Sequence, residues 1–261
     1  MPSHPTPDLP GKRRPESGLL RGVRSFLGET GNIVRLTLFS PRCKLCQQEL
    51  VYRSEVVVCN TCRTKINFCE LTRCRICGKF IEDSNSLCGS CSVRPPPFIR
   101  HASYAPYEDA LKELIILYKF GEIVPLKNLL ADCYLDLFGR LYPGRFDFIV
   151  PVPSNRNRGR EFAPVREIAR ILSRRLGISM LGDMLIKVRD TPPQVGLTLP
   201  QRVRNLNGVF RLKGGERGRG KNILLIDDVY TTGTTIRKCS ETLKKGKAIV
   251  HAITLAQSLR S

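Results

Sequence analysis

Residues 221–235 read Lys-Asn-Ile-Leu-Leu-Ile-Asp-Asp-Val-Tyr-Thr-Thr-Gly-Thr-Thr. Four apolar residues, Ile223 to Ile226, stand between polar ones, which is typical of a parallel strand covered on both faces. Asp227 and Asp228 follow this run, and a hydroxyl-rich turn comes next. In open α/β sheets, ligands bind in the crevice beyond the carboxyl ends of the strands. The stretch therefore predicts a strand, a ligand-binding turn and a following helix.

The turn suits a phosphate group. It consists of Thr231, Thr232, Gly233, Thr234 and Thr235. Gly233 permits a positive φ and a close backbone approach, and successive N–H groups at a helix start form an anion nest. The preceding carboxylates can accept hydrogen bonds from vicinal hydroxyls, whereas a P-loop would need a lysine that is absent. The combination indicates a sugar phosphate. A magnesium-binding strand end, as in a receiver domain, is the alternative.

Hydrophobic periodicity places this unit in a larger α/β core. We expect a helix at 111–118, a strand at 146–152, a helix at 163–176, a strand at 223–226, a helix at 233–245 and a strand at 248–255. Alternating units of this kind imply a parallel sheet flanked by helices.

Nine of the eleven cysteines lie between residues 41 and 92. Eight of them form four CxxC pairs: Cys43 and Cys46, Cys59 and Cys62, Cys74 and Cys77, Cys88 and Cys91. A turn with two intervening residues directs both thiolates at one ion, and two such turns close a tetrahedral zinc site. Eight thiolates fit two structural zinc ions. Sequential pairing is the simplest arrangement, while cross-braced pairing, disulfides and redox chemistry are the alternatives.

The chain divides into four segments. We expect a disordered basic tail at 1–17, an amphipathic helical segment at 18–40, a double zinc-binding domain at 41–97 and an α/β domain at 98–261, with Pro95-Pro96-Pro97 as the linker. The segment 18–40 suits docking onto the protein's own core or onto an anionic membrane. The sequence shows no signal peptide and no transmembrane span. We expect a cytoplasmic protein, with peripheral contact at the inner face of the membrane as an alternative.

The composition is strongly basic. Forty-three Lys and Arg against twenty-three Asp and Glu give a net charge of +20. The segment 154–220 alone holds fifteen basic and five acidic residues. Clustered cations attract pyrophosphate and nucleic-acid backbones alike, so the charge does not choose between these partners.

Residues 221–235 resemble the phosphoribosyl-pyrophosphate (PRPP) signature of type I phosphoribosyltransferases. More widely, residues 41–257 resemble the competence protein F (ComF) family, in which cysteine-rich zinc motifs precede a phosphoribosyltransferase domain. The other matching blocks are Pro-Arg-Cys-Lys-Leu-Cys at 41–46, Ile-Val-Pro-Val-Pro at 149–153, Arg-Asp-Thr-Pro-Pro-Gln-Val-Gly-Leu at 189–197 and Arg-Val-Arg-Asn-Leu-Asn-Gly-Val-Phe at 202–210. The resemblance implies a type I phosphoribosyltransferase-like parallel sheet at 98–261 behind an N-terminal zinc-binding domain.

The resemblance also assigns roles. It implies that Asp227 and Asp228 are the catalytic acids that hold the ribose hydroxyls, and that the turn 231–235 binds the 5-phosphate. The pyrophosphate side would comprise Pro153, Ser154, Arg156 and Arg158. A closing loop within residues 189–205 would contribute Gln194 and Arg202. Magnesium is expected to accompany PRPP as pyrophosphate departs.

One block departs from the family pattern. Where the family usually shows Arg-Gly-Phe-Asn-Gln, residues 160–164 read Arg-Glu-Phe-Ala-Pro. Glu161, Ala163 and Pro164 thus remove two amides and add an acid that repels pyrophosphate unless a cation neutralises it. The residues therefore support PRPP binding more directly than they support catalysis.

Two function classes follow. The first is an enzyme that transfers phosphoribose to an acceptor, which no residue constellation identifies. The second is a non-catalytic, zinc-dependent accessory protein of DNA uptake, with single-stranded DNA and DNA-uptake proteins as partners and PRPP as a ligand or signal. Seven Tyr, eleven Phe and no Trp make a weak stacking platform for bases but leave backbone binding open.

Overall fold

The computed structural model describes residues 42–50, 57–82, 87–154, 162–191 and 199–259. The expected tail at 1–17 and the amphipathic segment at 18–40 lie outside these ranges. Among the helices of the described residues, none combines the length and apolar character that a bilayer crossing requires.

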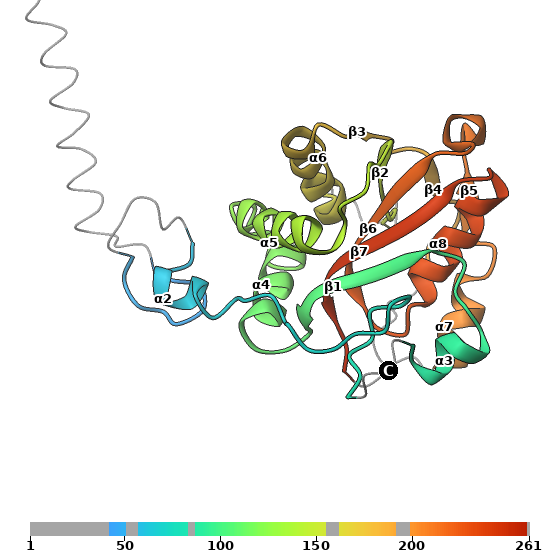
Figure 1. The fold of residues 1–261 in the computed structure, drawn as a ribbon. Helices are drawn as coiled ribbons and strands as arrows, with labels where there is room; N and C mark the ends of the chain where they lie inside the picture. Colours follow the sequence, from blue (N-terminus) through green and yellow to red (C-terminus); the bar gives the residue numbers. More distant parts are fainter. Residues whose placement is uncertain (1–41, 51–56, 83–86, 155–161, 192–198, 260–261) are drawn as a thin grey trace, which may run out of the picture.

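A five-stranded parallel sheet forms the centre of the larger domain (Figure 1). Its strands, in spatial order, are β1 (Arg100–Pro106), β7 (Ile249–Gln257), β6 (Asn222–Tyr230), β2 (Phe148–Pro151) and β3 (Ser179–Met180). Every neighbouring pair runs parallel. All five carboxyl ends therefore meet at one edge of the sheet, which we call the carboxyl edge. We call the opposite edge the amino edge.

Helices cover both faces of this sheet. One face carries α4 (Asp109–Lys119), α5 (Leu126–Leu141) and α6 (Pro164–Leu176), which share a core with Leu224 and Ile226. The other face carries α8 (Thr234–Lys245), whose apolar residues pack with Ile223 and Leu225. Successive residues of β6 thus enter opposite cores, as a pleated strand buried on both faces requires.

A small antiparallel hairpin adjoins α8. Its strands are β4 (Leu185–Lys187) and β5 (Phe210–Leu212), with α7 (Leu199–Leu206) in the connection and a 3₁₀ turn, η1 (Gly215–Gly218), after it. Together these elements and α8 form the right-hand side of Figure 1. The parallel sheet with flanking helices and the N-terminal cysteine-rich motifs confirm the predicted fold class.

Several boundaries correct the sequence-based expectation. The strand predicted at 223–226 runs from Asn222 to Tyr230, so both acids lie within β6 and not beyond it. Part of the expected closing loop at 189–205 is helix α7. The edge strand β1 and the helix α5 were not anticipated. Strand β1 has buried residues on both faces, including the polar residues His101 and Ser103, so its sequence shows neither an alternating nor a continuous apolar pattern.

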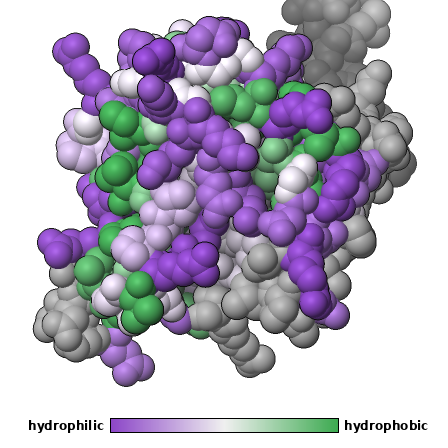
Figure 2. All heavy atoms as spheres, turned by 90° about the vertical axis from the view of Figure 1, so that its right-hand side faces the viewer, coloured by the Kyte–Doolittle hydropathy of each residue, from purple (hydrophilic) through white to green (hydrophobic). Residues whose placement is uncertain are grey.

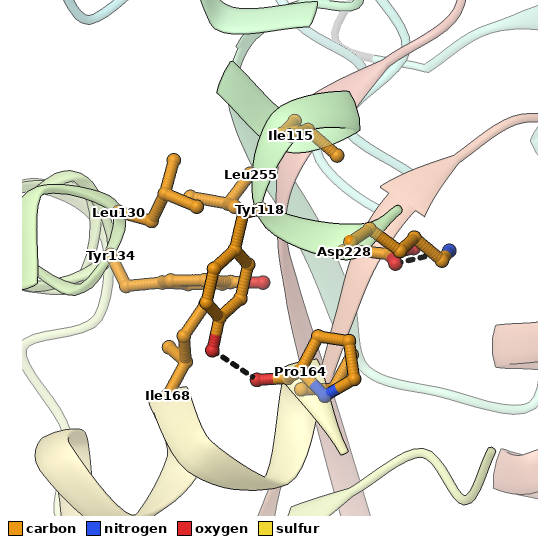
Figure 3. Close-up of a pocket in the computed structure, with 10 residues that line it drawn as sticks. Ile115, Tyr118, Leu130, Tyr134, Pro164, Ile168, Asp228 and Leu255 are labelled. Atoms are coloured by element: carbon orange, nitrogen blue, oxygen red, sulfur yellow. Dashed lines mark hydrogen bonds and ion pairs between the residues drawn. The ribbon is translucent and has the colours of Figure 1, made fainter. Parts of the chain in front are cut away.

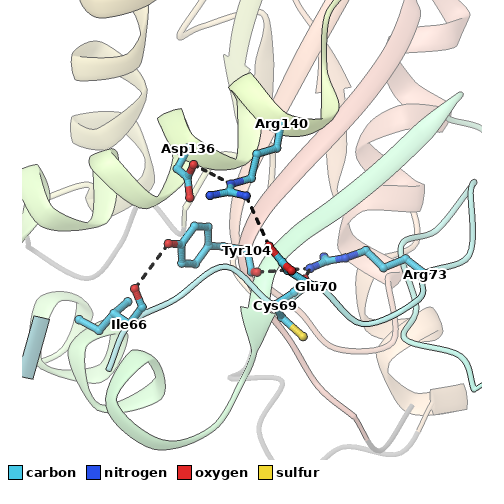
Figure 4. Close-up of polar contacts among 7 residues, drawn as sticks. All are labelled: Ile66, Cys69, Glu70, Arg73, Tyr104, Asp136 and Arg140. Atoms are coloured by element: carbon cyan, nitrogen blue, oxygen red, sulfur yellow. Dashed lines mark hydrogen bonds and ion pairs between the residues drawn. The ribbon is translucent and has the colours of Figure 1, made fainter. Parts of the chain in front are cut away.

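The cysteine-rich region is anchored to the larger domain through the stretch between its two halves (Figure 4). Arg73 donates to the carbonyl oxygens of Cys69 and Ser103, which joins this stretch to β1. The Tyr104 hydroxyl donates to the Ile66 carbonyl at 3.5 Å. From α5, Arg140 lies 3.7 Å from Glu70. The zinc motifs thus pack on the domain that carries the sheet.

Candidate functional site

The two acids lie at the carboxyl edge, near the end of β6. The Asp228 amide donates to Asp227 Oδ1 at 3.0 Å, and the Val229 amide donates to Asp228 Oδ1 at 2.8 Å. Each carboxylate is therefore held by the backbone of the next residue and keeps further lone pairs for a ligand. Asp228 faces the side of α4, α5 and α6 (Figure 3). Asp227 lies within electrostatic reach of Lys187 on the hairpin side.

A lysine that the sequence analysis did not select completes this group. Lys119, the last residue of α4, forms an ion pair with Asp228, which is the pair drawn beside Asp228 in Figure 3. The Lys119 side chain is 38% exposed and that of Asp228 is 14% exposed. The cation therefore reaches the acids from the solvent side.

The local electrostatics set the charge states. Burial and the neighbouring Asp228 charge raise the pKa of Asp227 to about 7, although Lys119 opposes this rise. Burial alone would lower the pKa of Lys119, but the charges of Asp228 and Asp227 outweigh it and raise that pKa. The two acids and the lysine behave as one cluster that responds to an incoming charge or hydrogen-bond donor.

Aromatic and aliphatic side chains form the floor beneath Asp228. They line a small cavity into which residues of α4, α5 and α6 converge (Figure 3). The Tyr118 hydroxyl donates to the Pro164 carbonyl at 3.0 Å, and the Tyr134 hydroxyl donates to the Asp227 carbonyl. These two tyrosines tie the helix layer to β6 and to the start of α6, so they fix the backbone that carries the acids.

The predicted phosphate turn connects β6 to α8. Gly233 has φ 72°, and a Cβ at this position would overlap the Tyr230 ring, so only glycine fits. The Thr232 and Thr234 hydroxyls lie 2.9 Å apart. The twelve-residue helix α8 begins at Thr234, and the N–H groups of its first turn point toward the turn. The residues predicted for a phosphate thus come together at the positive end of a helix.

The pyrophosphate side is described in part. Pro151 pairs with Ile226, so Pro153 and Ser154 follow β2 at the same edge as the acids. Arg156, Arg158 and Glu161 lie outside the described residues. These observations place the start of the predicted pyrophosphate loop beside the acids.

The residues at positions 163 and 164, which depart from the family pattern, lie at the start of α6. Ala163 is the N-cap residue of α6, and Pro164 occupies its first turn, where a proline ring is compatible with a helix. Alanine and proline at these two positions are therefore compatible with the start of α6.

The closing-loop residues are only partly placed. Gln194 lies outside the described residues, and Arg202 lies within α7. Helix α7 contacts α8, which starts at the phosphate turn.

The eight paired cysteines form two separate sets, as sequential pairing predicts. Within each set the four sulfur atoms lie within 4.8 Å of one another. A tetrahedral zinc with Zn–S bonds of about 2.3 Å needs sulfur atoms about 3.8 Å apart. Cys46 and Cys59 Sγ lie 3.7 Å apart, and Cys77 and Cys88 Sγ lie 3.6 Å apart. Both sets are therefore suited to hold a structural zinc ion.

The two sets repeat one local design. We call the half around residues 42–66 the first ribbon and the half around residues 73–93 the second ribbon. In each, the first CxxC pair lies in a short turn closed by an antiparallel bridge, Arg42 with Glu49 and Arg73 with Phe80. The third cysteine of each set caps a short helix, α2 (Asn60–Arg63) or α3 (Gly89–Val93). The second ribbon is an internal repeat of the first.

Sequence reasoning missed three residues of the site. Lys119 ends an apolar helix at Tyr-Lys-Phe-Gly, a block that resembles the family's entry to its catalytic domain, so the signal for it was present. Tyr134 and Lys187 reach the acids only through the packing of α5 and the hairpin. Their sequence neighbourhoods carry no comparable signal.

Comparisons with known proteins agree with the two-part architecture. The phosphoribosyl transferase domain family matches residues 127–261, and the double zinc ribbon domain family matches residues 34–92. DNA utilization protein YhgH of Escherichia coli (strain K12) is 30% identical over 224 residues, which cover 83% of this chain and 97% of that protein. Competence protein ComFC of Bacillus subtilis (strain 168) is 27% identical over 236 residues, covering 83% and 95%.

Among solved structures, an adenine phosphoribosyltransferase aligns with a TM-score of 0.37 and 16% identity, over 52% of this chain and 72% of that one. The family matches span both parts of the chain, and the relatives align with it over nearly their whole length. The chain therefore belongs to the ComF family of phosphoribosyl transferase domain proteins with an N-terminal double zinc ribbon.

Proposed function

We propose that this protein binds PRPP at the carboxyl edge of the sheet and transfers its phosphoribosyl group to an acceptor. The observation that carries the proposal is the adjacency of the acids of β6 and the turn 231–235 at the start of α8. A helix start and a glycine turn supply amides for the 5-phosphate, and carboxylates accept hydrogen bonds from ribose hydroxyls. A sugar phosphate would use both halves of this site.

The residues divide the work by chemistry. Asp227 and Asp228 hold the two ribose hydroxyls, and the threonine turn holds the 5-phosphate. When the bond from C1 to pyrophosphate breaks, positive charge develops at C1, and the adjacent carboxylates stabilise it. Lys119 leaves its ion pair with Asp228 and moves toward the anionic ligand, which replaces one charge-assisted interaction with another.

The pyrophosphate end is held by Ser154 after β2 together with Arg156 and Arg158, and Gln194 and Arg202 close over it. Magnesium supplied with PRPP would neutralise the pyrophosphate and compensate Glu161; oxygen ligands for it are available from the acids of β6.

The thiolate clusters require a reducing compartment, so we place the protein in the cytoplasm. We propose 41–97 and 98–261 as the zinc-binding and phosphoribosyltransferase-like domains.

Calorimetric titration of magnesium-PRPP into the zinc-loaded full chain tests the proposal. Wild-type protein is expected to bind, and the Asp227→Asn/Asp228→Asn variant is expected to lose binding. Asp147→Asn/Asp183→Asn is the matched control, because these acids form surface ion pairs with Lys221 and Arg166 away from β6's carboxyl end. Absence of wild-type binding by a folded, zinc-loaded protein would contradict the proposal.

A second candidate function is binding of single-stranded DNA, and a basic surface at the amino edge favours it. The basic edge, as we call it, consists of the exposed residues Arg211, Lys213, Arg217, Arg219, Lys221, Lys244, Lys245 and Lys247. The segments are adjacent, because the Gly220 amide donates to the Lys247 carbonyl at 3.0 Å and η1 packs on α8. Figure 2 shows that the side of the molecule formed by these elements is predominantly hydrophilic.

This candidate agrees with the names of the relatives, one a DNA utilization protein and another a competence protein. Backbone binding by clustered cations is sequence-independent and falls steeply with salt. Fluorescence anisotropy with a labelled oligonucleotide at several salt concentrations tests it. A slope of log affinity against log salt near zero would contradict an electrostatic DNA surface.

A further inference from the structure

The second ribbon shares a hydrophobic core with the residues on either side of the phosphate turn, and the first ribbon does not. Its four cysteines pack in one cluster with Tyr230, which ends β6, and with Ile236 and Cys239 of α8. The cysteines of the first ribbon that belong to a core pack instead with the helices of the opposite face. Two ribbons of the same local design thus have different neighbours.

The second ribbon is joined to β1 by backbone contacts around His101. The His101 amide donates to the Ile76 carbonyl at 2.7 Å. The His101 ring places Nδ1 2.7 Å from the Cys77 carbonyl, and since a carbonyl only accepts, Nδ1 carries the proton. Gly78 has φ 67°, and a Cβ there would lie 2.6 Å from the His101 carbonyl oxygen. The metal-binding turn at 74–78 therefore lies directly on β1.

The same histidine touches the residue that supports the phosphate turn. Its ring stacks on Tyr230 with centroids 4.0 Å apart and planes inclined by 21°. Nε2 of His101 faces the Thr254 hydroxyl at 3.1 Å, which fixes the ring orientation. Both side chains are buried: His101 is 1% exposed and Tyr230 is 5% exposed.

Tyr230 also lies against Gly233. A Cβ at Gly233 would overlap the Tyr230 ring and hydroxyl, so the phosphate turn packs directly against this ring. A continuous series of contacts therefore runs from Cys77 through His101 and Tyr230 to Gly233. Each member is buried, and because protein interiors are close-packed, displacement of one member is expected to move its neighbour.

We infer that His101 and Tyr230 are positioning residues through which zinc in the second ribbon holds the phosphate turn in its binding conformation. The four thiolates lose their common centre without metal, and the turn that carries Ile76 and Cys77 is released from β1. Release removes the support of the His101 ring and then of Tyr230. The inference rests on the proposed PRPP site and concerns what keeps that site in shape.

Matched cysteine variants test this coupling in the full chain. Cys88→Ser/Cys91→Ser disables the second ribbon, and Cys59→Ser/Cys62→Ser disables the first at the equivalent helix positions. Calorimetry with magnesium-PRPP is expected to show a loss of affinity of about tenfold or more for the second-ribbon variant and little change for the first-ribbon variant. Zinc content, expected to fall by one ion in each, is measured in parallel. Equal affinities of the two variants would overturn the inference.

Two measurements avoid the risk that a cysteine variant misfolds. Tyr230→Leu removes the stacked ring while leaving all eight cysteines, and it is expected to weaken PRPP binding about tenfold with zinc content unchanged, whereas Tyr230→Phe retains binding. In the wild-type protein, coupling is reciprocal, so PRPP should slow the release of one of the two zinc ions to a colorimetric chelator. The Cys59→Ser/Cys62→Ser variant, which retains only the second site, should show the slowed ion.

The outcomes separate this inference from the proposed function. Wild-type binding of PRPP with no effect on the release of either ion, together with normal affinity of Tyr230→Leu, would overturn the coupling and leave the site standing. A folded wild-type protein that does not bind PRPP would overturn both.

Discussion

At the carboxyl edge of the sheet, two half-buried acids lie beside the ion-paired Lys119, whereas the basic edge on the opposite side carries eight exposed cations. Within the described residues, the end of β6 that is proposed to hold the ribose is thus less basic than the amino edge. The reason is that backbone amides at the start of α8 can hold a phosphate, while the carboxylates hold hydroxyl groups. The net charge of +20 therefore does not locate the small-ligand site, and a different kind of anion suits the basic edge.

The strongest test of this contrast alters one glycine at each edge. Gly233→Ala at the carboxyl edge forces a Cβ into the Tyr230 ring, whereas Gly220→Ala at the amino edge has a similar φ of 69° with open space around it. We expect Gly233→Ala to weaken magnesium-PRPP binding about a hundredfold, since the displaced turn can no longer donate two or three amide hydrogen bonds to the phosphate. Calorimetry measures the affinity.

Gly220→Ala should bind PRPP like the wild type. Gly220→Ala should lose about 1 kcal/mol of stability, because it places alanine in a left-handed conformation, and Gly233→Ala should lose more, because its Cβ also overlaps the buried Tyr230 ring. Similar PRPP affinities for the two alanine variants would show that the turn 231–235 does not hold the ligand.

Removing the lysine tests whether the acids need a cation. Lys119→Met leaves the acids uncompensated and removes a charge-assisted interaction with the anionic ligand, so PRPP affinity should fall about tenfold. Lys112→Met, on the exposed face of the same helix, is the control and should have no effect. An increase in affinity for Lys119→Met would mean that the lysine competes with the ribose hydroxyls for Asp228.

Charge reversal at the other edge should affect a different ligand. Lys244→Glu/Lys245→Glu is expected to leave PRPP affinity unchanged. It should reduce the slope of log affinity against log salt for single-stranded DNA by about 1.4, because each lysine that no longer neutralises a phosphate removes about 0.7 from that slope. Anisotropy titrations at four salt concentrations measure this slope. Lys112→Glu/Lys127→Glu, a reversal of the same size on α4 and α5, should leave the slope unchanged. Equal slopes in both variants would remove the basic edge as the DNA surface.

The sequence was sufficient for the parts of the fold that are local. Ile223 to Ile226, the threonine turn and the helix after it predicted β6, the ligand-binding turn and α8 with small boundary errors. The regular CxxC spacing predicted both cysteine sets and their sequential pairing, which the geometry confirms. These signals are carried by residues close together in the chain.

What the sequence did not yield depends on packing between distant segments. Strand β6 extends beyond its apolar run because β7 continues to pair with it up to Tyr230, which no local pattern reveals. The stacking of His101 on Tyr230 joins residues 129 positions apart in the chain, which no local sequence pattern indicates. Lys119 becomes a site residue only when the end of α4 is brought to the carboxyl end of β6.

The smallest expected effect is the pH dependence of stability that Asp227 contributes at the carboxyl edge. The folded state raises the pKa of Asp227 to about 7, mainly by burial, while the unfolded chain keeps the ordinary value near 4. Between these values the native state holds a proton that the unfolded state has lost, so stability falls as pH rises through this window. From pH 6.5 to 8, wild-type protein should lose about 1 kcal/mol of stability relative to Asp227→Asn, because Asp227 releases its proton in the native state within this range.

Urea unfolding of the zinc-saturated proteins at several pH values measures this difference. Asp183→Asn is the control, because hydrogen bonding to Arg166 lowers the pKa of Asp183, and its effect on stability is confined to more acidic solutions. Its curve should therefore run parallel to that of the wild type across the window. If the stability curve of Asp227→Asn also runs parallel to that of the wild type, then Asp227 is ionised throughout this pH range. Solvent and the neighbouring cations would then stabilise its charge as fully as they stabilise that of a surface acid.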